Sequence, residues 1–380
     1  MNALLRPSSL YIGLMSGTSV DAIDGILVDF SPPFPKTLGF ASLPMSSRLR
    51  EDILALCLPG DNEIDRMGSL GVQLGELFAQ VANTVIAEAG VDRQAIAAIG
   101  SHGQTIRHRP ALPYPFTLQI ADPSVIAQLT GITTVADFRS RDLAAGGQGA
   151  PLVPAFHAAV FRAPAADRCV LNLGGIANIT VIPADRSQPI RGFDTGPGNL
   201  LMNAWIAKHR HEEYDKDGAW AAAGTCDERL LSLLLSDPYF SLPPPKSTGR
   251  EYFNVDWLMP KLGGHPRRLQ DVQATLCALT VQSVRCAVLE HAPSTAEVLV
   301  CGGGAYNGHL MNMLEREFAP VVVKSTEALG IAPKQVEAMA FAWLAKQTLS
   351  MKPGNLPSVT GASMPVILGG IYPGNLADQR

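Results

Sequence analysis

A hairpin of two short apolar runs around a polar bend occurs twice in the chain. The first joins LYIGLM to GILVDF through the bend SGTSVDAID at residues 16–24, and the second joins CVLNLGG, from Cys169, to NITVIPA. A third short apolar run follows each hairpin, TLGFASL in the first half and the run ending in GFDTGPGN in the second. Apolar runs of this length bounded by Gly, Asn and Asp indicate strands. The repeat predicts two α/β halves, each opening with antiparallel strands.

The remaining pattern extends both halves. Further strands are predicted in AAIGSHGQT, FTLQIA, ITTVADF, AEVLVC and PVVVKS, and helices around 48–57, 64–89, 123–131, 200–209, 308–318 and 334–349. We expect RSRD to be a charged loop, SLPPPKSTGR a surface excursion and KPGNLPSV a crossing between domains. The predicted domains are 1–142, completed by 353–380, and 143–352.

Composition narrows the class of protein. The 380 residues are 47% hydrophobic and 17% charged, which is typical of a globular protein long enough for two cores. A formal net charge of −4 argues against binding to the nucleic-acid backbone. The start of the chain has no apolar stretch that would suit a signal peptide or a membrane span, so we expect a cytoplasmic protein with no membrane partner. The 6 cysteines form no CxxC pair and are expected to be reduced, mostly buried thiols.

The first bend has the chemistry of a phosphate site. Glycine lets the backbone approach an anion, and successive N–H groups in a tight turn can surround it, so residues 16–19 (Ser16, Gly17, Thr18 and Ser19) could hold a phosphate. Asp21 and Asp24 would repel a bare phosphate but suit a bound Mg²⁺. The alternative is an ordinary hairpin turn, which favours the same residue types.

Two further glycine bends strengthen the phosphate interpretation. LNLGGIAN (171–178) forms the bend of the second hairpin, and CGGGAYN (301–307) lies between a predicted strand and a predicted helix. The third bend is no dinucleotide fingerprint, since GxGxxG from Gly302 needs glycine where Asn307 stands, and the chain has no GxxxxGK[ST]. A nucleotide held by two related halves remains the best explanation.

Several long motifs carry a family resemblance. In chain order these are GLMSGTSVDAID, AIGSHGQT, VADFRSRD, GGQGAPLVPAFH, LNLGGIANIT, FDTGPGN, PKSTGREYFN, CGGGAYN and VEAMAFAWLA. Together they resemble the anhydro-N-acetylmuramic acid kinases of the actin, hexokinase and Hsp70 superfamily. The resemblance implies an α/β protein in which two ribonuclease-H-like (actin/hexokinase-type) domains flank a cleft for nucleotide and substrate. The family's first loop usually reads DGxD, and Ala22 replaces that glycine here, so we expect a small change in this turn.

The resemblance also implies a reaction. Members of the family use ATP and Mg²⁺ to phosphorylate O6 of 1,6-anhydro-N-acetylmuramic acid while water opens the anhydro bridge at C1, which gives N-acetylmuramic acid 6-phosphate for cell-wall sugar recycling. Asp194, in FDTGPGN, matches the family's catalytic aspartate, and its alternative role is to cap the following helix. Asp21 would bind the Mg²⁺ ion. The nucleotide would be bound by Gly17, Thr18, Ser19, Val20, Asp21, Ala22, Ile23, Asp24, Gly174, Gly175, Asn178, Gly302, Gly303, Gly304 and Asn307.

The substrate's lactyl carboxylate needs a cation. Arg139 or Arg141 could supply a bidentate bond, although either could simply be solvated in a charged loop. Ser101, His102 and Gln104, at a predicted strand end, could bind sugar hydroxyls, and His102 could equally be structural.

Glu337 could accept a hydrogen bond from the sugar's amide. It is the acidic residue of an apolar predicted helix. Because it lies near the start of that helix, stabilisation by the helix dipole would also explain a glutamate at this position. Lys246 and Arg250 are expected to be structural or to act in domain closure.

Two rival functions remain open. A conventional sugar or acetate kinase of the same superfamily would use Asp194 to deprotonate a substrate hydroxyl. A nucleotide-driven conformational switch would keep the nucleotide loops without a small sugar pocket. A chain of this size is expected to form a homodimer.

Overall fold

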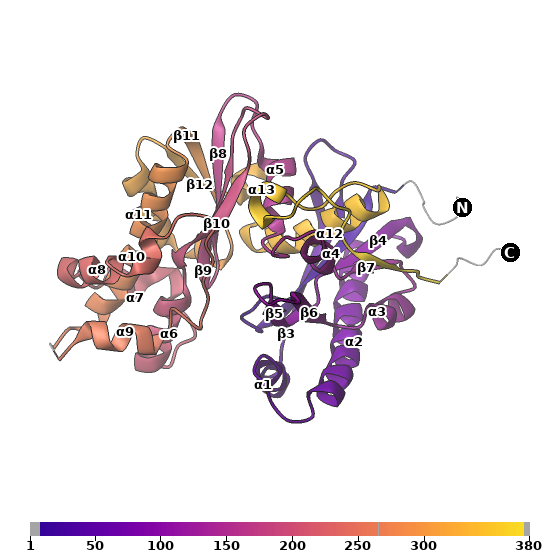
Figure 1. Ribbon diagram of the computed structural model, residues 1–380, viewed down its shortest axis with the longest axis horizontal. Coiled ribbons are helices and arrows are strands. Elements are labelled where there is room, and N and C mark those ends of the chain that lie inside the picture. The colour runs from indigo at the N-terminus through magenta and orange to yellow at the C-terminus, as the bar shows by residue number, and fades with distance from the viewer. Residues whose placement is uncertain (1–7, 265, 376–380) are drawn as a thin grey trace. The chain divides into compact units, whose positions relative to one another are not determined.

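The computed structural model describes residues 8–264 and 266–375 (Figure 1). The chain divides into two compact units by its internal contacts: unit 1 contains Met1–Phe156 and Gln335–Arg380, and unit 2 contains His157–Lys334. The helix α5 (Val153–Phe161) spans the first junction.

Unit 1 is built on a sheet with strand order β13-β7-β4-β1-β2-β3. Its strands are β1 (Leu10–Met15), β2 (Ala22–Asp29), β3 (Lys36–Pro44), β4 (Ile96–Ser101), β7 (Thr134–Ala136) and β13 (Gly370–Tyr372). The first three strands pair antiparallel, β4 and β7 continue the sheet parallel to β1, and β13 pairs antiparallel with β7. A separate two-stranded sheet consists of β5 (Gln104–Arg109) and β6 (Phe116–Ile120).

Unit 2 repeats the same strand order. Its sheet runs β10-β9-β8-β11-β12. The strands are β8 (Asp167–Leu173), β9 (Ile176–Ile182), β10 (Arg191–Pro197), β11 (Thr295–Cys301) and β12 (Val322–Ser325). As in unit 1, three antiparallel strands are followed by two parallel ones on the other side of the first strand. This meander with two added parallel strands is the ribonuclease-H-like arrangement, so the predicted repeat and fold class are confirmed.

The helices of unit 1 pack on its main sheet or on the elements that flank it. They are α1 (Ser47–Leu56), α2 (Glu63–Ala89), α3 (Pro123–Thr130), α4 (Ser140–Ala144), α12 (Val336–Leu349) and α13 (Pro357–Thr360). The backbone of α12 presses directly on the sheet, because a Cβ atom added at Gly13 of β1 would lie 1.8 Å from the Ala338 carbonyl oxygen, and one at Gly100 of β4 would lie 2.0 Å from that of Phe341. Only glycine at these two strand positions permits so close an approach.

That contact explains where the domain prediction differs from the structure. The segments 143–156 and 335–352 were expected in the second domain, but the structure groups both with unit 1. The second segment contains α12, which packs on β1 and β4, and the first is hydrogen-bonded to Asp142 and Thr360. The segment KPGNLPSV lies inside unit 1 and does not cross between units. The predicted RSRD loop is wrong, because these residues begin α4.

The longest helix of unit 2 is α10 (Leu269–His291), which packs against β9, β10 and most of the other helices of the unit. The others are α6 (Leu200–Arg210), α7 (Ala219–Ala222), α8 (Glu228–Leu235), α9 (Val255–Leu262) and α11 (Gly308–Phe318). Among the described residues, α10 alone is long and apolar enough to cross a membrane, but 78% of its most apolar window is buried within the protein. A core helix of a globular domain has the same character, and α10 contributes to the main apolar cluster of unit 2.

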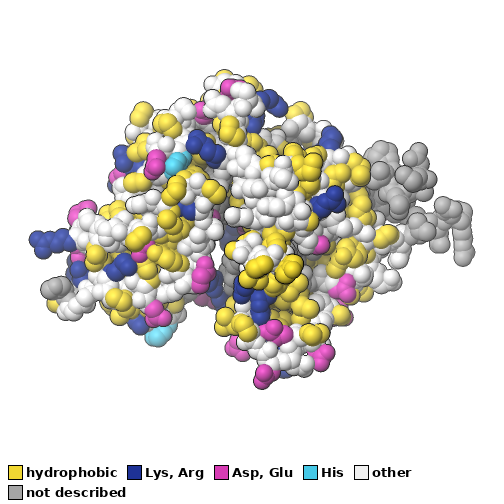
Figure 2. Space-filling view, in the orientation of Figure 1, with side chains coloured by type: hydrophobic (Ala, Val, Ile, Leu, Met, Phe, Trp, Pro, Cys, Tyr) yellow, Lys and Arg dark blue, Asp and Glu magenta, His cyan; other side chains and the backbone are white. Residues whose placement is uncertain are grey.

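The visible surface carries charge of both signs. On the face shown in Figure 2, Lys and Arg side chains are interspersed with Asp and Glu, and no continuous basic field covers this face. This mixture agrees with the small net charge of −4.

Candidate active site

The first bend presents free backbone donors. The N–H groups of Gly17, Thr18 and Ser19 find no hydrogen-bond partner among the residues that the structure describes, while the Val20 N–H donates to the Gly17 carbonyl at 3.2 Å. Val20 has a left-handed φ of 53°, which is unusual for a β-branched residue, and its side chain is buried in the core. A backbone held in a sparsely populated conformation with unpaired N–H groups suits the binding of a phosphate.

Asp21 and Asp24 lie on either side of the start of β2. The exposed Asp21 accepts at Oδ1 from the Ser19 hydroxyl at 2.5 Å and the Ala22 N–H at 3.1 Å, and Asp24 accepts from the Ser42 hydroxyl at 2.6 Å. Ala22 begins β2 without a positive φ, so the replacement of glycine there causes no backbone strain.

These residues fit a magnesium ion that arrives with a nucleotide. The described residues contain no group of three or more His, Cys, Asp or Glu that could hold a metal alone. Magnesium is usually held by one or two carboxylates together with substrate phosphates and water. An exposed carboxylate beside a phosphate loop, as at Asp21, is therefore a suitable ligand.

Two of the residues predicted for the site, Ser16 and Gln104, support the first bend through hydrogen bonds within unit 1. The buried Ser16 hydroxyl lies 2.7 Å from Oε1 of Gln104 and 3.1 Å from the Ala22 carbonyl oxygen. Gln104 was predicted to contact substrate, yet its Nε2 also donates to the Thr105 carbonyl at 3.2 Å. Both ends of its amide are engaged within unit 1, so its contacts support the loop.

The second bend is braced by the start of α6. The N–H groups of Gly198 and Leu200 donate to the Gly175 carbonyl, and that of Asn199 donates to the Gly174 carbonyl, at 2.9, 3.1 and 2.9 Å. These bonds occupy the carbonyl groups of Gly174 and Gly175 and fix the bend against the start of α6. Asn178 is the register partner of Asp194 across β9 and β10, which brings these two predicted site residues together on one face of the sheet.

The third bend packs tightly on the end of β8. Gly302 has a φ of 81°, and a Cβ there would lie 2.4 Å from Oδ1 of Asn172. A Cβ at Gly304 would lie 2.6 Å from that of Leu173, whereas a Cβ at Gly303 would meet no atom of the described residues within 4 Å beyond its chain neighbours. Asn307 caps α11 by accepting from the Leu310 N–H at 3.0 Å. Gly303 is therefore the residue of this bend that lies open to a ligand.

Asp194 lies at an irregularity of β10 and is fixed by a neighbouring loop. Its Oδ2 accepts from the Thr248 N–H at 3.0 Å, its own N–H donates to the Lys246 carbonyl at 3.1 Å, and its carbonyl accepts from the Tyr239 hydroxyl at 2.8 Å. Burial raises the pKa of Asp194 to about 6, with the Thr248 N–H opposing and the charge of Glu251 adding to the rise. The helix α6 has Asn199 as its N-cap, so Asp194 does not cap it. A carboxyl with this pKa can accept a proton near neutral pH.

Sequence reasoning missed the part that PKSTGRE plays. Lys246 donates from Nζ to the carbonyl oxygens of Tyr239 and Phe240, both at 3.2 Å, and lies 4.9 Å from the centre of the Tyr239 ring. These contacts support the expected structural role of Lys246. They also fix the loop whose backbone holds Asp194, a function that no sequence signal of the Pro-rich segment indicates.

A second cluster in unit 1 gathers residues predicted to bind the sugar. Arg139 Nε and Nη2 lie 3.2 and 2.8 Å from Nε2 of His102, and Nη1 donates to the Gly149 carbonyl at 2.8 Å. Burial and the Arg139 charge lower the pKa of His102 to about 3, so the ring is neutral and accepts at Nε2. Burial lowers the pKa of Arg139 to about 10, against the opposing charges of Glu337 and Asp142, so Arg139 stays charged at neutral pH.

Glu337 lies in the first turn of α12 and interacts with this cluster. Burial raises the pKa of Glu337, Arg139 lowers it, and Asp24 raises it. The carboxylate is therefore electrostatically linked both to the first bend and to the predicted sugar-binding arginine. Arg141, the alternative cation, is exposed on α4.

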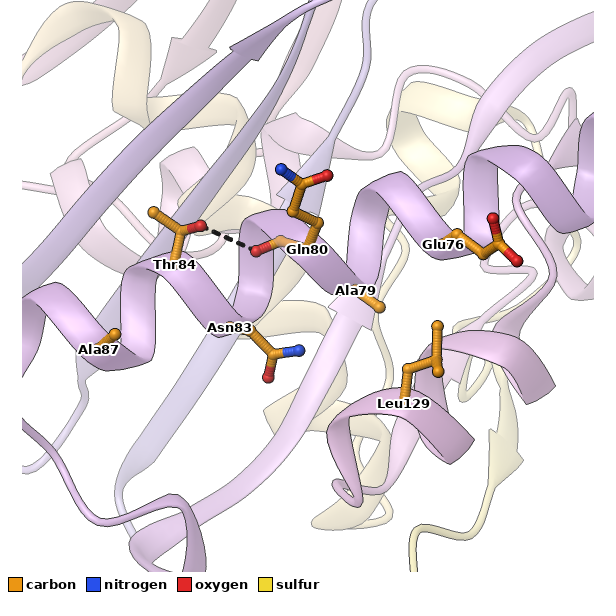
Figure 3. A pocket seen from close by; sticks show the side chains of 7 residues that line it. All are labelled: Glu76, Ala79, Gln80, Asn83, Thr84, Ala87 and Leu129. Atoms are coloured by element: carbon orange, nitrogen blue, oxygen red, sulfur yellow. Dashed lines mark hydrogen bonds between the residues drawn. The ribbon is translucent and has the colours of Figure 1, made fainter.

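A small cavity of about 90 Å³ adjoins the cluster. It is lined by Ser101, His102, Gly103, Gln119, Ala121, Pro123, Ala136, Asp137 and Tyr372. The Ser101 hydroxyl is buried and has no hydrogen-bond partner in the part of the chain that the structure describes. A larger hollow of about 520 Å³ lies over α2 and α3 and is lined by Glu76, Ala79, Gln80, Asn83, Thr84, Ala87 and Leu129 (Figure 3). These seven residues include none of the predicted site residues, so we assign the chemistry to the loops.

Comparison with known proteins agrees with the motifs. The family model described as anhydro-N-acetylmuramic acid kinase matches residues 9–374. Proteins of that name are 52% identical over 373 residues in Saccharophagus degradans (97% of this chain, 100% of the relative), and 51% over 366 residues in Coxiella burnetii (96% and 98%). A third, from Xanthomonas campestris pv. campestris, is 53% identical over 370 residues (96% and 98%). The chain therefore belongs to the anhydro-N-acetylmuramic acid kinase family.

Proposed function

We propose that this chain uses ATP to phosphorylate O6 of 1,6-anhydro-N-acetylmuramic acid while water opens the anhydro ring, which yields N-acetylmuramic acid 6-phosphate and ADP. The observation that carries the proposal is Asp194, a half-buried carboxyl whose pKa is raised to about 6 and whose orientation is fixed by the Thr248 N–H. A base of this strength can take a proton from water at neutral pH.

The proposed reaction couples two steps at the C1–O6 bond. Phosphoryl transfer to O6 makes this oxygen a better leaving group, while Asp194 accepts the proton of the water that attacks C1. The arrangement resembles an inverting glycoside hydrolase in which the γ-phosphoryl group replaces the general acid. The N–H groups of Gly17, Thr18 and Ser19, which are unpaired among the described residues, would bind phosphate oxygens. Magnesium, held in part by Asp21, would offset the negative charge of the phosphates.

The lactyl carboxylate would bind Arg139. An arginine side chain has five N–H donors, and three of those of Arg139 are directed at His102 and Gly149. The other two, one on each terminal nitrogen, have no protein partner within residues 8–264 and 266–375, and could form a bidentate pair with a carboxylate. We therefore favour Arg139 over the exposed Arg141. Ser101 and His102 would contact the sugar, and Glu337 would accept from its amide.

The test is a coupled assay of ADP release with the anhydro sugar, glucose, N-acetylglucosamine or no sugar. We expect release with the anhydro sugar alone, and solvent ¹⁸O in the C1 hydroxyl of the product, because water attacks C1. A conventional sugar kinase would incorporate no solvent oxygen into its product. A nucleotide-driven switch would release ADP at the same rate without sugar. Either result would contradict the proposal.

Replacing Asp21 with Asn should lower turnover by roughly tenfold at limiting Mg²⁺, because a carboxylate that helps hold the metal is lost. Stability should change little, since Asp21 is exposed and exposed substitutions usually have small effects. We would measure kcat against Mg²⁺ concentration and the Tm, with the exposed Asp52→Asn as the control. An unchanged Mg²⁺ dependence would remove Asp21 from the metal site.

We also propose a cytoplasmic homodimer as the working form of the enzyme. The substrate is a small sugar that a cell would recover from its wall. Its phosphorylation requires ATP, so the enzyme would work in the cytoplasm, which contains ATP. Sedimentation of the purified chain would test the dimer.

A further inference from the structure

The buried carboxylate of Asp142 joins three separate segments of unit 1. Its side chain is fully buried, and Oδ1 accepts from Nδ2 of Asn355 at 2.7 Å and from the Thr360 hydroxyl at 2.8 Å. Its Oδ2 accepts from the Gly149 N–H at 2.8 Å. A buried carboxylate is costly unless its oxygens are hydrogen-bonded, and these three bonds meet that need.

Gly149 continues the connection to Arg139. It has a left-handed φ of 69°, and its carbonyl accepts from Nη1 of Arg139 at 2.8 Å. The N–H and the carbonyl of one residue are thus held by two different side chains, those of Asp142 and Arg139. Asp142 also adds a favourable charge near the guanidinium, which burial disfavours. A shift of Gly149 would therefore turn the guanidinium and its two remaining donors.

The segment that follows α12 fixes the other side of Asp142. Oδ1 of Asn355 accepts from the Val366 N–H at 2.7 Å, and the Thr360 carbonyl accepts from the Gln148 N–H at 2.8 Å. A Cβ added at Gly147 would lie 2.3 Å from Oδ2 of Asp142, so this loop closes tightly around the carboxylate. The order of contacts runs from Asn355 and Thr360 through Asp142 and Gly149 to Arg139.

We propose that Asp142 is a positioning residue for recognition of the substrate's carboxylate, acting through the backbone of Gly149 to aim the guanidinium of Arg139. The inference rests on the proposed function, in which Arg139 binds the lactyl carboxylate. It assigns to Asp142 and the segment 355–360 a part in substrate selection, although neither touches the sugar. A group held by so rigid a set of bonds binds a carboxylate without first ordering its side chain.

The test compares two sugars in the Asp142→Asn variant. Asn can still accept from Asn355 and Thr360 through its oxygen, but its NH₂ group would face the Gly149 N–H and displace that peptide. We expect KM for 1,6-anhydro-N-acetylmuramic acid to rise on the order of 10- to 100-fold, because small misplacements of a binding group are costly. KM for ATP and for 1,6-anhydro-N-acetylglucosamine, which lacks the lactyl group, should stay unchanged.

A second pair of variants distinguishes a selective effect on substrate recognition from a general loss of folding. Thr360→Val removes a hydroxyl that donates to Asp142, and Thr348→Val removes an equally buried hydroxyl that donates to the Leu344 and Leu368 carbonyls at 2.9 and 2.6 Å. We expect Thr360→Val to raise KM for the lactyl sugar selectively and Thr348→Val to leave the ratio of the two sugars unchanged.

The outcomes separate the inference from the proposed function. If the wild-type chain turns over the lactyl sugar but Asp142→Asn and Thr360→Val lose activity equally on both sugars, Asp142 is structural and the inference is wrong. If the wild-type chain turns over no anhydro sugar, the proposed function fails first and the inference falls with it.

Discussion

Replacing Asp194 with Asn is expected to lower kcat by a factor on the order of 10² to 10⁴, which is the usual contribution of a general base. Asn keeps the size of the side chain and can still accept from the Thr248 N–H, which lies 3.0 Å from Oδ2. It cannot take a proton from water. Binding of ATP and of the sugar should therefore remain near normal while turnover is lost.

The measurement follows both half-reactions. ADP formation and ring opening should fall together in Asp194→Asn, since each assists the other at the C1–O6 bond. In the wild-type enzyme kcat should fall as the pH drops below about 6, where Asp194 becomes protonated. If the variant still releases ADP and gives a phosphorylated sugar with an intact anhydro ring, Asp194 serves the water step alone. Full activity would place the base elsewhere.

The hairpins and the parallel strands could be predicted because their signals are local. Apolar runs bounded by glycine bends indicate each strand, and α11 occupies the predicted range 308–318. The long helix α10 was missed, because every residue from Val272 to Val281 is buried and the sequence shows no apolar stripe of helical period. RSRD was mistaken for a solvated loop because its buried carboxylate, Asp142, has partners more than 200 residues away in the sequence, such as Asn355.

The candidate site also has parts that could be predicted from the sequence and parts that could not. Glycine spacing predicted the three bends, and the family resemblance pointed to Asp194; the roles of these residues stay predictions. The partners that give these residues their chemistry were hidden, since the Thr248 N–H and the Gly149 carbonyl are backbone groups whose residue type carries no signal. Gln104 was predicted to bind the sugar because it is a polar residue at a strand end. Its amide is hydrogen-bonded to Ser16 and Thr105, so it supports the first bend, and residue type alone did not indicate this role.

Asp194→Asn is also expected to stabilise unit 2 against unfolding at neutral and alkaline pH. The folded-state pKa of about 6 lies above the ordinary aspartate value of 3.8, so folding disfavours the ionised carboxylate. This cost is absent below about pH 4, where the group is protonated in both states, grows as the pH rises from 4 to 6, and is complete above 6. A difference of about two pKa units corresponds to about 3 kcal/mol. The neutral Asn side chain avoids this cost at every pH.

The measurement is the difference in unfolding free energy between Asp194→Asn and wild type, from urea unfolding at several pH values between 4 and 8. Trp205, Trp220 and Trp257 lie in unit 2 and Trp343 lies in unit 1, so tryptophan fluorescence is followed in a Trp343→Phe background, where it reports on unit 2. Any constant effect of the substitution cancels, and the difference should move in favour of the variant by about 3 kcal/mol as the pH rises. Asp227→Asn is the control without a slope in this range, because the hydrogen bond from Arg267 lowers the pKa of Asp227, so its carboxylate stays ionised in both states down to about pH 4 and loses its stabilising effect only at lower pH. A difference for Asp194→Asn that stays flat from pH 4 to 8 would mean that Asp194 ionises as freely in the folded chain as in the unfolded one, and would remove the raised pKa on which its role as a base depends.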